Sequence, residues 1–282
     1  MLNPPGQSSM DQALEQLLAR VSAALRHLPG ALECYLFGSA ADAARRDAYS
    51  DLDVQVVTHD FALSRAAWPW ILNRAGRIEL AFSVQQTANE STYTLALAGE
   101  SPYHKIDIGL CDPCAQPGFF HGIAHKRLLW QQPADRQPVH LSANAEAYAP
   151  PTGSAAYFLM SQLLGAVRYL KARKRGQHLS CWRFLSAAFH ASLRCRGWDG
   201  DAEHFPSDPL STWDFAALDA ALPESERLER LQALRVQSPA QMDATLIELT
   251  RGLAACLCPP EAHAARLTAA YLEFIESELR PG

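Results

Sequence analysis

The pattern of hydrophobic and polar positions changes partway along the chain, from strand-like segments to helical repeats. In the first part, short apolar or alternating segments favour β-strands, and apolar residues at helical spacing favour helices before and among them. The predicted strands are 31–37, 52–58, 78–86, 92–98 and 104–110, and the predicted helices are 11–28 and 60–74. This order of elements predicts a small mixed β-sheet with accompanying helices.

In the second part, the long segments repeat apolar residues at helical spacing. The predicted helices are 154–175, 179–194, 210–222, 224–236, 239–257 and 261–279. Prolines break both helix and strand, so Pro150 and Pro151 indicate a boundary directly after Ala149. We therefore expect the α+β fold class, with a small mixed sheet in a catalytic domain at 1–149 and an all-α helical bundle, the acceptor-side domain, at 150–282.

Three local signals refine these elements. Ser9 and Gln12 have the spacing of a capping box at the start of the first helix. The segment 39–47 is rich in alanine and predicts a short helix. Ser238 followed by Pro239 indicates the start of another helix.

Three carboxylates are the strongest candidates for chemistry. Asp51 and Asp53 stand two positions apart, so they project from the same face of a strand, and Asp107 lies in another predicted strand. Three carboxylates brought together form an all-oxygen site that suits Mg²⁺. In two-metal sites the ions lie roughly 4 Å apart and share carboxylates. We therefore expect two Mg²⁺ ions, with Asp51 and Asp53 as the shared pair and Asp107 nearer the acceptor.

A turn at Gly38 and Ser39 precedes these carboxylates. Glycine lets the backbone approach a phosphate closely, and the Ser39 hydroxyl and nearby N–H groups can hold phosphate oxygens. Such a turn beside metal-binding carboxylates predicts nucleotidyl transfer, in which an acceptor oxygen replaces pyrophosphate at the α-phosphorus of a nucleotide.

The segment YLFGSAADAARRDAYSDLDVQVV resembles the signature of the nucleotidyltransferase superfamily that includes DNA polymerase beta. That signature is a hydrophobic strand, Gly-Ser, about a dozen residues, and then Asp-hydrophobic-Asp; Asp107 stands where the family has its third carboxylate. In layout, the chain is most similar to bacterial antibiotic nucleotidyltransferases, which use ATP and Mg²⁺ to adenylylate a hydroxyl of an aminoglycoside or a lincosamide. The resemblance implies catalytic and metal-binding roles for Asp51, Asp53 and Asp107, and a role in antibiotic resistance.

Three functions are compatible with this pattern. The first is an enzyme that moves AMP from ATP to a small hydroxylated acceptor, with Asp107 or an acidic residue of the second domain taking the proton. The second is a toxin-like nucleotidyltransferase that acts on tRNA or protein, which the net charge of −5 does not favour. The third is a non-catalytic nucleotide-binding module. The acceptor, the preferred nucleotide, the general base and the oligomeric state stay open.

Basic residues offer further candidates. We expect Lys171 and Lys174 to bind the nucleotide when the second domain closes on it, although a solvated helix end is the alternative. Lys105 shares a strand face with Asp107, so it either contacts a phosphate or offsets the charge of the carboxylates. Arg45 and Arg46 fit a solvated helix face better than a triphosphate site.

Two clusters have competing interpretations. The first cluster has the residue types of a zinc site, but the gap between its pairs is shorter than in a zinc finger; it consists of Cys111, Cys114, His121 and His125. In the alternative interpretation, the two thiols lie beside the sheet and the histidines lie on a short surface helix at 121–130. Tryptophans and acidic residues of the second domain could bind a polycationic acceptor, or could be core tryptophans beside a solvated acidic loop. These residues are Trp182, Trp198, Trp213, Asp199, Asp201, Glu203, Asp208 and Asp214.

Composition narrows the cellular setting. A spanning helix needs ~20 largely apolar residues, and no run approaches that length. The N-terminal residues lack the positive flank and apolar core of a signal peptide. We therefore expect a soluble cytoplasmic protein that does not enter a membrane and whose seven cysteines are thiols.

Overall fold

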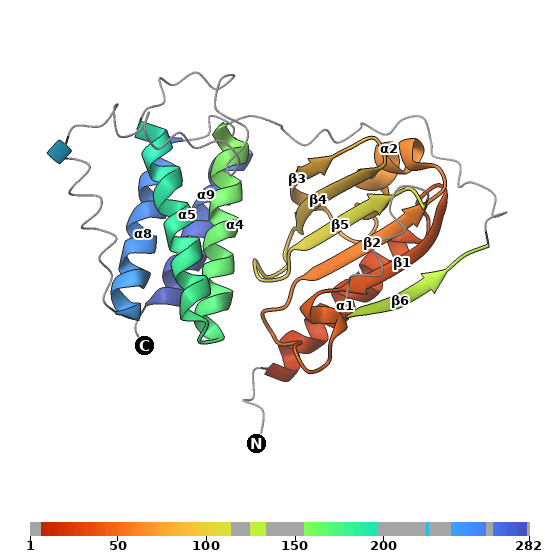
Figure 1. Ribbon diagram of the computed structural model, residues 1–282, viewed down its shortest axis with the longest axis horizontal. Coiled ribbons are helices and arrows are strands. Elements are labelled where there is room, and N and C mark those ends of the chain that lie inside the picture. The colour runs from red at the N-terminus through yellow and green to blue at the C-terminus, as the bar shows by residue number, and fades with distance from the viewer. Residues whose placement is uncertain are drawn as a thin grey trace. The chain divides into compact units, whose positions relative to one another are not determined.

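The computed structural model describes residues 7–113, 125–133, 155–196, 224–225, 238–257 and 262–280 (Figure 1). The chain divides into two compact units, Met1–Pro150 and Pro151–Gly282. Every described helix is too short or too polar to cross a membrane.

The first unit is built on a six-stranded mixed sheet with the strand order β3-β4-β5-β2-β1-β6. Its elements are α1 (Gln7–Leu25), β1 (Ala31–Phe37), η1 (Ser39–Ala41), β2 (Leu52–Thr58), α2 (Phe61–Leu72), β3 (Ile78–Gln86), β4 (Glu90–Leu97), β5 (Ile106–Cys111) and β6 (Lys126–Gln131). The central strands β2 and β5 are parallel, and the other neighbouring strands are antiparallel. With the helical second unit, this confirms the predicted α+β class.

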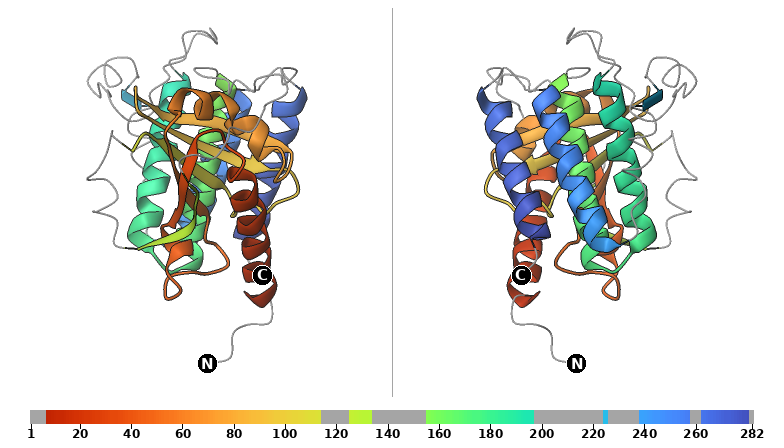
Figure 2. Two further views of the ribbon diagram at one scale, coloured as in Figure 1. Left: turned by 90° about the vertical axis from the view of Figure 1, so that its right-hand side faces the viewer. Right: turned by 90° about the vertical axis from the view of Figure 1, so that its left-hand side faces the viewer.

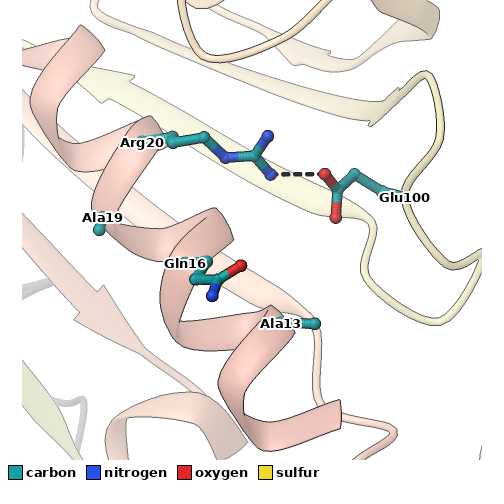
Figure 3. Close-up of a pocket in the computed structure, with 5 residues that line it drawn as sticks. All are labelled: Ala13, Gln16, Ala19, Arg20 and Glu100. Atoms are coloured by element: carbon teal, nitrogen blue, oxygen red, sulfur yellow. Dashed lines mark hydrogen bonds and ion pairs between the residues drawn. The ribbon is translucent and has the colours of Figure 1, made fainter. Parts of the chain in front are cut away.

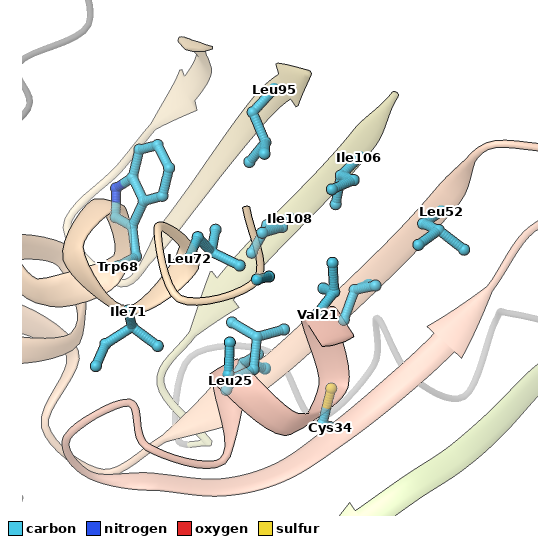
Figure 4. Packing of buried hydrophobic residues seen from close by; sticks show 14 of the residues in the cluster. Val21, Leu25, Cys34, Leu52, Trp68, Ile71, Leu72, Leu95, Ile106 and Ile108 are labelled. Carbon is cyan, nitrogen blue, oxygen red and sulfur yellow. The ribbon is translucent and has the colours of Figure 1, made fainter. Parts of the chain in front are cut away.

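The core of this unit lies between the sheet and the helices α1 and α2, which cover one face (Figures 1 and 4). Alternate residues of β2, Leu52, Val54 and Val56, are fully buried there. Trp68 of α2 packs on Tyr93 of β4 with their ring centroids 4.3 Å apart. Burying this apolar face leaves the opposite face of the sheet for polar side chains.

Local hydrogen bonds overturn the predicted helix at 39–47. Only Ser39–Ala41 form a helical turn, the 3₁₀ element η1. The Asp42 carboxylate accepts from the Ala44 N–H at 3.0 Å, and the Asp47 carboxylate accepts from the Tyr49 N–H at 3.0 Å. Aspartate side chains that bind nearby backbone in this way compete with helix formation.

Two other local predictions are wrong. The capping box fails because α1 begins at Gln7, which places Ser9 inside the helix. The described part of the helix predicted at 121–130 is instead β6, an edge strand that pairs with β1. Pairing with β1 overrides the local propensity, and Trp130 fixes the strand against α1: its side chain is buried, and its Nε1–H donates to the Ser22 carbonyl at 3.2 Å.

The described helices of the second unit run side by side (Figures 1 and 2). They are α4 (Ala155–Lys174), α5 (His178–Arg196), α8 (Pro239–Cys256) and α9 (Ala262–Leu279). Their buried faces include Leu163 of α4, Leu185 of α5, Leu246 of α8 and Ile275 of α9, each fully buried. The start of α8 is confirmed, because the Ser238 hydroxyl accepts from the Gln241 N–H at 3.3 Å. The predicted helix at 210–222 lies outside the described residues. So does the predicted helix at 224–236, apart from residues 224–225.

Candidate functional site

Asp51, Asp53 and Asp107 lie together where β2 and β5 begin. Parallel pairing sets Asp53 directly opposite Asp107, and Asp51 directly precedes β2. One carboxylate oxygen from each residue lies within 4.8 Å of the other two. Because Leu52 is fully buried in the core, the alternation of the strand turns its aspartate neighbours to the other face. All three carboxylates are half-buried.

Gly38 lies against the Asp53 carboxylate. Phe37, the last residue of β1, pairs with Asp53, so the chain turns directly beside it. Gly38 has φ +70°, and a Cβ added there would lie 2.2 Å from Asp53 Oδ2. Only glycine fits both the backbone conformation and the close approach of the carboxylate. Ser39 follows as the first residue of η1 and is half-buried.

Lys105 brings a cation into the group. Its Nζ lies 2.8 Å from Asp51 Oδ2 and donates to Asp107 Oδ2, and the side chain is 3% exposed. Of the two roles predicted for this residue, the geometry favours charge compensation. The neighbouring His104 has a different partner, since its Nε2 lies 3.2 Å from the Ala48 carbonyl.

Thr94 is a site residue that the sequence did not reveal. It lies in β4 opposite Asp107, and its buried hydroxyl donates to Asp107 Oδ1 at 2.5 Å. Threonine is common in strands, so the residue type alone carried no signal. Only the register of β4 against β5 identifies its role, which is to orient the carboxylate.

The donor set fits a magnesium ion. Carboxylate oxygens are the ligands that Mg²⁺ prefers, and among the described residues these three aspartates are the group whose geometry can hold a metal. Asp51, Asp53 and Asp107 would hold it. Arg46, a possible triphosphate ligand, instead pairs with Glu15 of α1.

The predicted nucleotide-binding lysines lie in the second unit. Lys171 of α4 is buried, with 5% of the residue exposed. Lys174 lies 2.9 Å from the Glu278 carboxylate of α9, beside a pocket of about 520 Å³. Arg173 and Asp243 also line this pocket, and they pair at 3.3 Å. Nucleotide binding by Lys171 and Lys174 stays a prediction.

The zinc hypothesis also stays a prediction, because Cys114 and His121 lie outside the described residues. Burial raises the pKa of the Cys111 thiol to about 11, which disfavours the thiolate that zinc requires. His125 Nδ1 lies 3.5 Å from Asp42 Oδ2.

Of the second-domain tryptophans, Trp182 is described and is 51% exposed, so it does not belong to the core. Both Trp198 and Trp213 lie outside the described residues. So do the acidic residues that accompany them, Asp199, Asp201, Glu203, Asp208 and Asp214.

A pocket in the first unit lies beside α1, and none of the three carboxylates lines it. It measures about 500 Å³ and is lined by Ala13, Gln16, Ala19, Arg20 and Glu100 (Figure 3). Arg20 and Glu100 form an ion pair across it at 2.5 Å. Its two charged groups therefore pair with each other, and the three aspartates remain the candidate site.

Comparison with known proteins leaves the family unassigned. No protein-family model and no curated protein matches the chain. Among solved structures, one similar chain is an aminoglycoside 6-adenyltransferase from Bacillus subtilis, with 12% sequence identity and a TM-score of 0.28. The match covers 94% of this chain and 98% of that one. A TM-score this low does not establish a shared fold.

Proposed function

We propose that the chain is a Mg²⁺-dependent nucleotidyltransferase that moves AMP from ATP to a hydroxyl of a small molecule of the aminoglycoside type. The observation that carries this proposal is the convergence of Asp51, Asp53 and Asp107 within 4.8 Å on adjacent parallel strands. Three carboxylates so close repel one another, and a divalent cation relieves that repulsion.

The residues of the first unit have separate roles in metal binding, phosphate binding and proton transfer. Asp51, Asp53 and Asp107 hold the metal, which when bound stabilises negative charge on the phosphate oxygens. The turn at Gly38 brings the backbone close to the triphosphate, and the Ser39 hydroxyl donates to a phosphate oxygen. The acceptor proton passes to Asp107 or to an acidic residue of the helical unit.

The helical unit, 150–282, is proposed to carry the acceptor side. There Lys171 and Lys174 would neutralise the triphosphate. Because Lys174 is paired with Glu278, it would have to exchange that carboxylate for a phosphate.

A labelling experiment tests the function. The protein is incubated with labelled ATP, GTP, CTP or UTP and Mg²⁺, in the presence of an aminoglycoside panel, total tRNA or the protein alone. We expect label from ATP on an aminoglycoside. Label on tRNA or protein alone would instead support the toxin-like enzyme, and label on no acceptor would support the non-catalytic module.

A substitution pair tests the site. Asp53→Asn should lower the transfer rate by about a thousand-fold, because several kcal/mol of metal-derived stabilisation is lost and each ~1.4 kcal/mol is a factor of ten. Asp112→Asn, just beyond β5, removes one carboxylate outside the site and should keep activity within about two-fold. Full turnover by Asp53→Asn would remove the metal assignment.

A further inference from the structure

We propose that the ammonium group of Lys105 fills one of the two cation positions expected at the carboxylate centre, so that the protein binds a single divalent ion there. The inference rests on the proposed function and revises its metal site in two ways: one ion is bound instead of two, and Asp107 holds the ammonium instead of the ion. Two divalent ions are the usual expectation for a site that shares carboxylates. Lys105 supplies a cation from the chain itself.

The contacts place the ammonium between two of the three carboxylates. Lys105 Nζ lies 2.8 Å from Asp51 Oδ2 and donates to Asp107 Oδ2, so it links the carboxylates of β2 and β5. The other oxygen of Asp107 accepts from Thr94 at 2.5 Å. Both oxygens of Asp107 are therefore engaged, and an ion using this residue would compete with two donors.

The position of Lys105 is fixed by its backbone as well as by its charge. Its carbonyl accepts from the Leu52 N–H at 3.1 Å, which ties it to the start of β2. The Leu52 side chain is fully buried, and the Lys105 residue is itself 3% exposed. A buried ammonium held between two carboxylates belongs to the carboxylate centre and is not a surface charge.

Charge balance supports a single ion. The three carboxylates and Lys105 together leave two negative charges, which one Mg²⁺ neutralises. A second divalent ion roughly 4 Å from the first would face both that ion and the ammonium across a partly buried site. We therefore assign the divalent ion to Asp51 and Asp53, and the Asp51–Asp107 position to Lys105.

The experiment counts Mn²⁺ ions bound to the full chain without nucleotide, from the electron paramagnetic resonance signal of free Mn²⁺. The unmodified protein should bind one ion. Lys105→Met, which keeps the length and removes the charge, should bind two. The matched control is Lys126→Met in β6, which removes an exposed lysine of the same unit and should bind one.

A second pair of variants does not require Lys105 to be replaced. Asp53→Asn should lose the ion, with at least a tenfold weaker affinity. Asp107→Asn should weaken the binding of the ion less than Asp53→Asn does, because Asp107 is assigned to the ammonium and not to the ion. The reverse order of these two effects would overturn the assignment.

The outcomes separate this inference from the proposed function. Two ions on the unmodified protein, or one ion on a folded Lys105→Met protein, would overturn the inference and leave the metal centre intact. No ion on any of these proteins would overturn both.

Discussion

The two units use charged side chains in different ways. In the sheet unit, three carboxylates and one buried lysine gather at the adjacent starts of β2 and β5. In the helical unit, charges pair one to one between helices: Arg251 with Glu276 at 2.7 Å, and Lys174 with Glu278 at 2.9 Å. The lysine of the sheet unit faces two carboxylates, whereas each cation named in the helical unit faces one.

This difference distinguishes a charged cluster that binds a ligand from ion pairs that only stabilise the fold. Half-exposed ion pairs contribute at most about 1 kcal/mol, and losing one changes little. An excess of carboxylates lowers stability unless a cation joins them, so such a cluster indicates a ligand. Each prediction below compares a residue with a matched control, first at the carboxylate site and then within the helical unit.

Among the comparisons that follow, the largest effect is expected at Gly38. Gly38→Ala should lower transfer at least about a hundred-fold, because the new methyl group would lie 2.2 Å from Asp53 Oδ2 and must displace that carboxylate. The matched control is Gly99→Ala, which has φ +81° but no atom within 4 Å of the added Cβ.

Both glycine variants carry the strain of a positive φ, of order 1–3 kcal/mol, so both should melt at a lower temperature. Only Gly38→Ala should lose activity and Mn²⁺ binding. Equal activity losses in the two variants would show that backbone strain, not the carboxylate, makes Gly38 important. Steady-state kinetics and thermal denaturation measure the two quantities.

The next effect is expected at Thr94. Thr94→Val removes the buried hydroxyl that donates to Asp107 Oδ1, and hydrogen bonds to charged groups contribute about 1.5–3 kcal/mol. We expect a loss of unfolding free energy in that range in urea titrations, with transfer about tenfold slower.

Thr250→Val is the control in the helical unit. Its hydroxyl is also buried, but it donates within α8 to the Leu246 carbonyl at 2.9 Å. Such bonds back to the preceding turn add little to helix stability. We therefore expect a change below about 0.5 kcal/mol; equal losses for the two threonines would contradict the special role of Thr94.

How far the sequence predicts the structure differs between these features. The bounds of β1, β2 and β3 are those predicted, because each is a short apolar run limited by turn residues. The face shared by Asp51 and Asp53 follows from the period of the strand alone. The contact of Thr94 with Asp107 depends on the register between β4 and β5, and no local pattern reveals that register.

The same limit explains the wrong predictions. The helix expected at 121–130 fails in its described part because pairing with β1 overrides local propensity. The helix at 39–47 fails because two aspartates bind nearby backbone N–H groups. For Lys105 the sequence indicated the correct face, but only the positions of its two carboxylate partners favour charge compensation over a phosphate contact.

A smaller effect is expected within the helical unit at Tyr169. The fully buried Tyr169 donates its hydroxyl to Asp243 Oδ1 at 2.6 Å, and burial, with the adjacent carboxylate, raises its pKa so that it remains a donor. Tyr169→Phe should lower the free energy of unfolding by about 1–2 kcal/mol. Arg173→Met, which removes the partly exposed cation paired with the same carboxylate, should cost less than about 1 kcal/mol. The opposite order would show that ion pairs stabilise this unit more than buried hydrogen bonds.

The smallest effect is expected at His190 of α5, where burial lowers the pKa of the imidazole below its usual 6.5. The unfolded chain therefore takes up the proton first as the pH falls, and the stability present above pH 6.5 decreases as the pH drops toward the lowered value. His190→Leu should remove this part of the decrease, because leucine does not titrate. His178→Gln, at the exposed start of the same helix, is the control. Urea titrations at pH 7.5 and 5.5 measure the difference. A pH response unchanged by His190→Leu would show that the half-buried imidazole does not cause it and that other groups of this unit do.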